Sequence, residues 1–233
     1  MEPACPGDQA SKRKEEPPEK ISIFPGQETP LTSLQGKSSM SLHPLLSRRP
    51  IVIALAGPNG AGKSTFFDAH LSDAGLYFVN ADVLTLSLGL NPYTAADLAD
   101  KTRRQLVAQR ESFIFETVFS DPAGDKLEFL KECERTGYTV LLIFIGISKP
   151  EISNQRVAMR ASSGGHDVPA KKLIERFPRT MKNLKRALAE LSYVWVYDHS
   201  DLERGYFLAA QLENGQKIEV HEPTPEWLRI LLP

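Results

Sequence analysis

One short segment carries the residues with the clearest chemistry, Gly57-Pro58-Asn59-Gly60-Ala61-Gly62-Lys63-Ser64-Thr65. Glycine, four residues and then Gly-Lys-Ser is the spacing of a phosphate-binding loop. Its glycines allow the backbone to wrap around a phosphate with the N–H groups inward, and the following helix adds a positive dipole. Lys63 is expected to reach the β and γ oxygens of ATP, and Ser64 is expected to ligate Mg²⁺. The segment therefore predicts a nucleotide-binding site.

Two polar pairs follow predicted strands, at the sheet edge where open parallel sheets bind ligands. They are Asn80 with Asp82, and Glu116 with Thr117. Asp82 is our candidate for the group that accepts the proton of an attacking hydroxyl. Asn80, Glu116 and Thr117 are candidate substrate-binding residues, and Glu116 is also placed to bind water on Mg²⁺. The alternatives are an Asx turn that caps the next segment and a polar strand exit.

Three arginines flank a glycine-rich loop further along the chain. Arg156 and Arg160 are four residues apart on a predicted helix and so share one face, while Arg176 lies on the next helix. The intervening residues 162–167 resemble a flexible lid, and kinases use such arginines to neutralise the transferring phosphoryl group. Taken singly, each arginine is more often a solvated helix residue, so the interpretation rests on three of them flanking one loop.

The elements that must position these residues alternate between short β-branched runs and helical patterns, which indicates βαβ units. We predict an α/β fold, with a P-loop NTPase-type parallel sheet, helices on both faces, a kinase-like lid and a small C-terminal β-hairpin around Asn214-Gly215. A kink is expected at Pro178. The predicted strands are Ile51–Ala56, Tyr77–Asn80, Ser112–Glu116, Tyr138–Ile145 and Tyr193–Tyr197, with helices over 94–110, 122–136, 149–160 and 169–191.

Residues 1–49 differ in composition from the rest of the chain. Serine and proline recur, and apolar residues show no sustained period, so we predict a disordered or partner-binding extension before a kinase domain at residues 50–233. Two short apolar pieces, Ile21–Phe24 and Leu42–Leu46, are the parts of this extension able to dock on the domain or on a partner.

Composition narrows the classes of partner. The 233 residues carry a formal net charge of −1 and a pI near 6.5, which gives no global reason to expect nucleic acid or an anionic membrane as partner. Two cysteines cannot build a disulfide framework. The apolar runs are under half the length that spans a bilayer. These features predict a cytoplasmic protein.

Other P-loop classes lack their markers here. A motor or transporter ATPase normally has an acidic residue at the end of a second apolar strand, yet Tyr138–Ile145 is followed by Gly146-Ile147-Ser148. The Asn-Lys-x-Asp element of guanine-nucleotide switches is absent from the sequence. These two observations favour a kinase over a motor and over a guanine-nucleotide switch.

At these residues the sequence resembles the zeta toxin family of bacterial P-loop kinases, and more closely its compact branch, labelled zeta-toxin or UDP-N-acetylglucosamine kinase. The resemblance runs from about Ile51 to Ser200. Its pieces are Gly57–Thr65 as Walker A, Asn80-Ala81-Asp82 as the Asn-x-Asp element, Phe115-Glu116-Thr117 as the strand end, 164–169 as the lid, and Tyr197-Asp198-His199-Ser200 as the last-strand exit.

The resemblance implies a fold like that of shikimate and nucleotide kinases. It implies Asp82 as general base, Glu116 and Thr117 near a UDP-sugar, and phosphate-clamping roles for Lys63, for Arg156 or Arg160, and for Arg176. In the best-known members the acceptor is the 3′-hydroxyl of the amino sugar of UDP-N-acetylglucosamine, and an antitoxin protein blocks the ATP site. Two departures are Pro178, which should break the helix after Arg176, and His199, which replaces the usual asparagine.

The sequence thus predicts a kinase that uses ATP and Mg²⁺, with UDP-N-acetylglucosamine as the first-choice acceptor. The rival hypotheses are a kinase for another metabolite or an antibiotic, and a regulatory ATP-binding module whose output is protein association. A third is a stand-alone ATPase.

Overall fold

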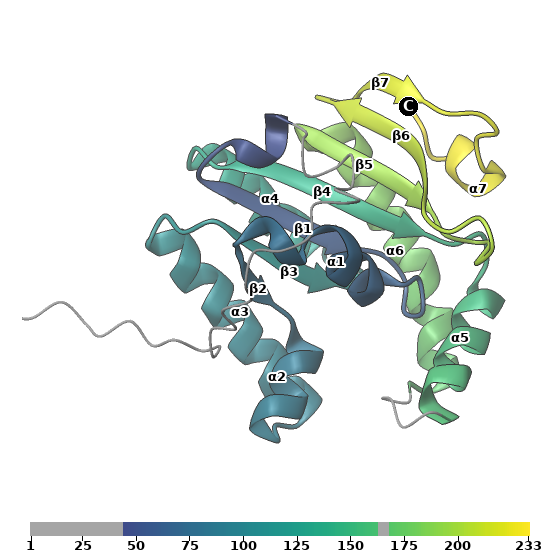
Figure 1. The fold of residues 1–233 in the computed structure, drawn as a ribbon, viewed down its shortest axis with the longest axis horizontal. Helices are drawn as coiled ribbons and strands as arrows, with labels where there is room; N and C mark the ends of the chain where they lie inside the picture. Colours follow the sequence, from purple (N-terminus) through teal and green to yellow (C-terminus); the bar gives the residue numbers. More distant parts are fainter. Residues whose placement is uncertain (1–43, 163–167) are drawn as a thin grey trace, which may run out of the picture. The chain divides into compact units, whose positions relative to one another are not determined.

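A seven-stranded sheet is the central feature of the computed structural model, which describes residues 44–162 and 168–233 (Figure 1). The strand order is β2-β3-β1-β4-β5-β6-β7. The first five strands in this order pair in parallel, and β6 and β7 add to β5 in antiparallel fashion. The strands are β1 (Ile51–Ala56), β2 (Tyr77–Val79), β3 (Phe113–Thr117), β4 (Thr139–Gly146), β5 (Tyr193–Asp198), β6 (Phe207–Glu213) and β7 (Gln216–Val220).

The register between β1 and β3 brings the C-terminal ends of these two strands together. β1 lies between β3 and β4, and Leu55 and Ala56 of β1 are paired with Glu116 and Thr117 of β3. Because parallel strands end at the same edge of a sheet, the segment after β1 starts beside the polar end of β3. The phosphate-binding loop therefore lies next to Glu116.

Helices cover both faces of the sheet, which explains why β1 is apolar and buried along its whole length (Figure 1). Alternate β1 residues contribute to two cores. Helices α3, α4, α6 and α7 contribute to one core, while α1 and the short η2 turn contribute to the other. The helices are α1 (Lys63–His70), α2 (Ala81–Leu88), α3 (Pro92–Ala108), α4 (Asp125–Arg135), α5 (Pro150–Ser162), α6 (Ala170–Glu190) and α7 (Glu226–Arg229), with 3₁₀ turns η2 (Pro44–Ser47) and η3 (Ser72–Ala74).

The predicted fold class is confirmed: the sheet is mostly parallel, helices flank both faces, and the C-terminal hairpin forms around Asn214-Gly215. Helix α2 was not predicted. Its eight residues include Leu86 and Leu88, which are exposed, so it lacks a clear apolar stripe. Its boundary signals are local instead: the side chain of Asn80 caps its start, and Gly89 ends it in the left-handed conformation.

The expected break at Pro178 is not found, because α6 runs as one helix from Ala170 to Glu190. A proline inside a helix removes one backbone donor. In the same turn the side chain of Arg179 donates from Nε to the carbonyl oxygen of Glu175 at 3.1 Å. Tertiary packing supports the helix further along, since Leu184, Ala187 and other α6 residues are buried.

The predicted lid at residues 162–167 and most of the predicted N-terminal extension lie outside the described residues, apart from the backbone of Ser162 in α5. Within the described part of the extension, Leu45 is buried in the core that also contains Phe66 of α1. In the described ranges, none of the helices has the length and apolar character needed to cross a bilayer.

Candidate active site

The loop between β1 and α1 has the backbone conformation that its glycines permit. Gly57, Gly60 and Gly62 all have positive φ, at 143°, 72° and 92°. A Cβ atom added to Gly57 would lie 2.1 Å from the carbonyl oxygen of Ile145, and one added to Gly62 would lie 2.7 Å from Tyr206 Oη. Both conformation and close packing therefore require glycine at these two positions.

Three side chains contact carbonyl groups of the loop. Lys63 Nζ donates to the carbonyl oxygen of Pro58 at 3.1 Å, and Ser153 Oγ donates to that of Asn59 at 2.6 Å. Arg156 Nη1 lies 3.4 Å from the carbonyl oxygen of Gly60. Because these carbonyls are engaged by side chains, the N–H groups of the loop residues remain available for an anion. Ser153 was missed by the sequence analysis because nothing in its local pattern predicts a contact 94 residues away.

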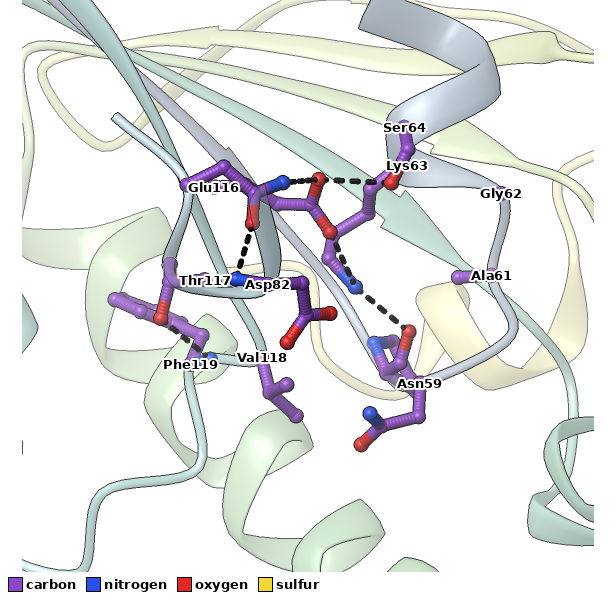
Figure 2. A network of polar contacts seen from close by, with 12 residues as sticks. Asn59, Ala61, Gly62, Lys63, Ser64, Asp82, Glu116, Thr117, Val118 and Phe119 are labelled. Atoms are coloured by element: carbon purple, nitrogen blue, oxygen red, sulfur yellow. Dashed lines mark hydrogen bonds and ion pairs between the residues drawn. The ribbon is translucent and has the colours of Figure 1, made fainter. Parts of the chain in front are cut away.

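Glu116 joins the phosphate-binding loop to Asn80 of the other polar pair (Figure 2). Its Oε2 accepts a hydrogen bond from Ser64 Oγ at 3.0 Å and another from Asn80 Nδ2 at 2.8 Å. Its Oε1 lies 3.5 Å from Lys63 Nζ, and both side chains are largely buried, at 12% and 6% exposed. The structure therefore brings together Lys63, Ser64, Asn80 and Glu116 at the edge where β1 and β3 end.

Asp82 lies in the first turn of α2. Asn80 caps this helix, since its Oδ1 accepts from the backbone N–H groups of Asp82 and Val83 at 2.8 and 3.4 Å. Asn80 thus forms the cap considered as an alternative and also binds Glu116. The Asp82 residue is exposed, and Figure 2 shows its carboxylate directed into the space between the phosphate-binding loop and residues Thr117 and Val118.

The three predicted arginines have different environments. Arg156 donates through Nη1 to the carbonyl oxygen of His199 at 2.8 Å and through Nη2 to that of Ser200 at 3.2 Å. Its guanidinium therefore connects the loop to the segment after β5. Arg160 belongs to α5, but its side chain lies outside the described part of the structure. Arg176, on α6, is partly buried and lines a separate pocket.

This pocket lies between the segment after β3 and helix α6 and has a volume of about 390 Å³. It starts at Thr117, directly after Glu116, and two arginines, Arg176 and Arg179, bring positive charge to it. Arg179 was not singled out in the sequence analysis. The lining residues are Thr117, Val118, Phe119, Ser120, Asp121, Pro122, Arg176 and Arg179.

Two protein oxygen atoms at the phosphate-binding loop are of the kind that binds Mg²⁺. Ser64 Oγ and Glu116 Oε2 lie 3.0 Å apart, and hard oxygen atoms are the ligands that Mg²⁺ prefers. Among the described residues, no group of three or more His, Cys, Asp or Glu side chains forms a metal cage. Two protein oxygens fit a cation whose other ligands are phosphate oxygens and water.

Comparison with known proteins gives a consistent result. The sequence profile of the zeta toxin family matches residues 89–207, just over half of this chain. This range contains Glu116, Thr117, Arg156 and Arg176 but begins after the phosphate-binding loop. An uncharacterized protein of Haemophilus influenzae is 28% identical over 120 residues, which cover 49% of this chain and 83% of that protein.

Two solved structures share the fold. A chain of the AvrRxo1-ORF1:AvrRxo1-ORF2 complex with sulphate ions has a TM-score of 0.61 and 20% identity over 80% of this chain, and this chain spans 64% of that chain's length. A chain of the PezAT chromosomal toxin-antitoxin system of Streptococcus pneumoniae has a TM-score of 0.51 and 19% identity, covering 79% of this chain and 85% of that one.

The strand order and the loop between β1 and α1 define a P-loop protein with a mostly parallel α/β fold. Since the family profile covers more than half of the sequence, the chain belongs to the zeta toxin family.

Proposed function

We propose that the protein is an ATP-dependent small-molecule kinase of the zeta toxin type, which transfers the γ-phosphoryl group of Mg-ATP to a sugar hydroxyl. One observation carries this proposal. Lys63, Ser64 and Glu116 are in contact at the phosphate-binding loop, and the Asp82 carboxylate is directed toward the same region (Figure 2). Phosphoryl transfer requires a phosphate site, a cation site and an acceptor for the hydroxyl proton in one place.

The loop residues Gly57–Thr65 would bind the ATP phosphates through their N–H groups and Lys63. Ser64 and Glu116 would hold Mg²⁺ directly or through water. When bound, this ion supplies positive charge that neutralises the phosphate oxygens. A structure of the AvrRxo1-ORF1:-ORF2 complex determined with ATP supports nucleotide use within this fold.

Asp82 is the proposed general base. Its carboxylate would accept the proton of the acceptor hydroxyl while that oxygen forms a bond to the γ-phosphorus. The bond between the γ-phosphorus and the bridging oxygen breaks, and ADP leaves with the electron pair. Exposure of Asp82 to solvent suits this role, since the acceptor must reach it.

The pocket beside Thr117 is the proposed acceptor site. Asn80, Glu116 and Thr117 would contact the sugar, and Arg176 would neutralise charge on the phosphoryl group. Two arginines in the lining favour an acceptor with anionic groups. UDP-N-acetylglucosamine, whose diphosphate carries such charge, is our first-choice acceptor.

In this proposal Arg156 supports the loop, and Arg160 of α5 neutralises charge on the transferring phosphoryl group. An antitoxin protein is the proposed partner and the cytoplasm the proposed location. Partner proteins occur in both structural relatives, since one is named as a complex of two open reading frames and the other as a toxin-antitoxin system.

An acceptor panel tests the proposal. Purified protein is incubated with Mg-ATP and nucleotide sugars, nucleosides or aminoglycosides, and products are identified by mass spectrometry. We expect UDP-N-acetylglucosamine to gain one phosphate and the Lys63→Ala variant to form no product. If a different compound is phosphorylated, the acceptor assignment is wrong; if no compound is modified although ATP binds, the kinase proposal fails.

A further inference from the structure

Two aromatic rings outside the proposed catalytic group contact the phosphate-binding loop. Nδ1 of His199, after β5, lies 2.7 Å from the carbonyl oxygen of Ala61. Oη of Tyr206, before β6, donates to the carbonyl oxygen of Gly62 at 2.7 Å. The two rings stack on each other, with centroids 4.1 Å apart and planes at 24°. Two consecutive loop carbonyls are therefore held by one stacked pair.

The ionisation of both rings suits hydrogen-bond donation. Burial raises the pKa of Tyr206, so the hydroxyl keeps its proton at neutral pH. Burial lowers the pKa of His199, which favours the neutral ring. Since a carbonyl oxygen can only accept, the short contact to Ala61 requires the proton on Nδ1. The contact thus selects one tautomer of His199.

The rings pack directly against the loop as well as binding it. A Cβ atom added to Gly62 would lie 2.7 Å from Tyr206 Oη and 2.8 Å from His199 Nδ1. Behind the pair, the buried ring of Phe66 meets Tyr206 edge to face at 5.0 Å. Tyr206 and His199 therefore confine the loop at Gly62 by packing as well as by hydrogen bonds.

The backbone that carries His199 is itself fixed. The N–H group of His199 donates to the carbonyl oxygen of Gly146 at 2.9 Å. The preceding carboxylate, Asp198 Oδ1, accepts from Ser200 Oγ at 2.6 Å and from Trp227 Nε1 at 2.8 Å. Because these bonds fix the backbone at His199, its side chain does not move freely with the phosphate-binding loop. His199 can therefore hold the loop in place.

We propose that His199 and Tyr206 are positioning residues that fix the phosphate-binding loop through its Ala61 and Gly62 carbonyls. Together with the N–H group of Phe66, which also binds the Gly62 carbonyl at 2.9 Å, these bonds hold the loop backbone and leave its N–H groups preorganised for an anion. Preorganisation lowers the ordering cost of binding. The positioning role itself does not depend on the proposed function. Its consequence, tighter ATP binding, does rest on the proposed function.

Amide hydrogen exchange of the loop in the ATP-free protein tests the positioning itself. Tyr206→Phe removes one donor and keeps the ring, and His199→Leu removes the other. In both variants we expect exchange at residues 59–64 to be roughly two- to tenfold faster, the range set by the net value of one hydrogen bond. His199→Asn retains a side-chain N–H donor and should remain near the native rate.

Tyr193→Phe is the matched control. It removes a tyrosine hydroxyl at the other end of β5, where the hydroxyl accepts from Arg48 Nη1 at 2.8 Å, and loop exchange should be unchanged. Native exchange in the Tyr206→Phe variant would overturn the proposal. So would equal acceleration by Tyr193→Phe, which would mean that loss of any hydroxyl loosens the loop. Both outcomes are measured on the Tyr206→Phe and Tyr193→Phe variants, so the test holds even if the His199→Leu variant does not fold.

ATP titration separates this inference from the proposed function. If the native protein binds ATP, Tyr206→Phe should raise the Kd by roughly the same two- to tenfold and leave kcat near native. A large fall in kcat at unchanged Kd would contradict a positioning role. If the native protein binds no ATP while loop exchange still responds to Tyr206→Phe, the proposed function fails and the positioning role stands.

Discussion

At the scale of single residues, Glu116 connects the parts of the candidate site, since it contacts Ser64, Asn80 and Lys63. The position of Glu116 at the end of β3 could be predicted, because the end of a strand is a local feature of the sequence. The phosphate-binding loop could be predicted as well, because its residue spacing is also local. Tyr206 could not be predicted in the same way. Its bond to Gly62 spans 144 residues and depends on how β5 and β6 leave the sheet.

Glu116→Gln tests the proposed cation site. The variant keeps the size of the side chain but removes the negative charge near Ser64 and Lys63. We expect the Mg²⁺ concentration for half-maximal phosphoryl transfer to rise about 10- to 100-fold, by analogy with the loss of groups around bound metals. Glu111→Gln, before the start of the same strand, is the control. An unchanged Mg²⁺ dependence in Glu116→Gln would remove Glu116 from the cation site.

At the scale of elements, a charged cluster joins α3 to α4. Asp100 of α3 is paired with the buried Arg103 and with Lys126 of α4, the latter at 2.9 Å. Burial raises the pKa of Asp100, but its hydrogen bond to Lys126 and the charges of Lys126 and Arg103 lower it to about 2. The presence of α3 and α4 followed from the sequence, whereas this pairing depends on the tertiary placement of the two helices.

Acid unfolding tests the cluster. The unfolded chain, in which Asp100 has the ordinary aspartate pKa of 3.8, binds more protons than the folded one as the pH falls. Asp100 therefore contributes stability above about pH 4, which is lost as the pH falls toward 2. We expect Asp100→Asn to lower the free energy of unfolding at pH 7 and the deficit to shrink over that window. A constant deficit from pH 7 to pH 2 would contradict the pairing.

Asp97→Asn is the control for this measurement. Asp97 pairs with Lys101 on the same helix, and both side chains are well exposed, at 63% and 72%. Exposed pairs of this kind contribute little, so the change in stability should stay within about 0.5 kcal/mol.

At the scale of the whole molecule, the segment after β5 extends the sheet and its core. The family profile ends at residue 207, yet β6, β7 and α7 continue the same sheet and its core. Trp227 of α7 packs on Gly146 at the end of β4, where an added Cβ would lie 2.1 Å from the ring, and it also donates to Asp198. The sequence predicted the hairpin but not α7, because four residues carry too little periodic signal.

Trp227→Ala tests this coupling by urea unfolding. Loss of a buried indole should lower the free energy of unfolding by about 3–5 kcal/mol, because a cavity forms and Asp198 loses a donor. Ile230→Ala is the control, since Ile230 is 74% exposed, and should change stability by less than about 0.5 kcal/mol. Equal effects of the two variants would show that α7 does not support the sheet.

The central claim is phosphoryl transfer with Asp82 as general base, and its most direct test is the rate of acceptor phosphorylation by the Asp82→Asn variant. We predict that the native protein phosphorylates an acceptor, and that the variant binds ATP normally but transfers at least about 100-fold more slowly. Asp73→Asn, at an exposed aspartate of η3, should match the native rate. A native rate in Asp82→Asn, or ATP binding without transfer to any acceptor in the native protein, would contradict the account.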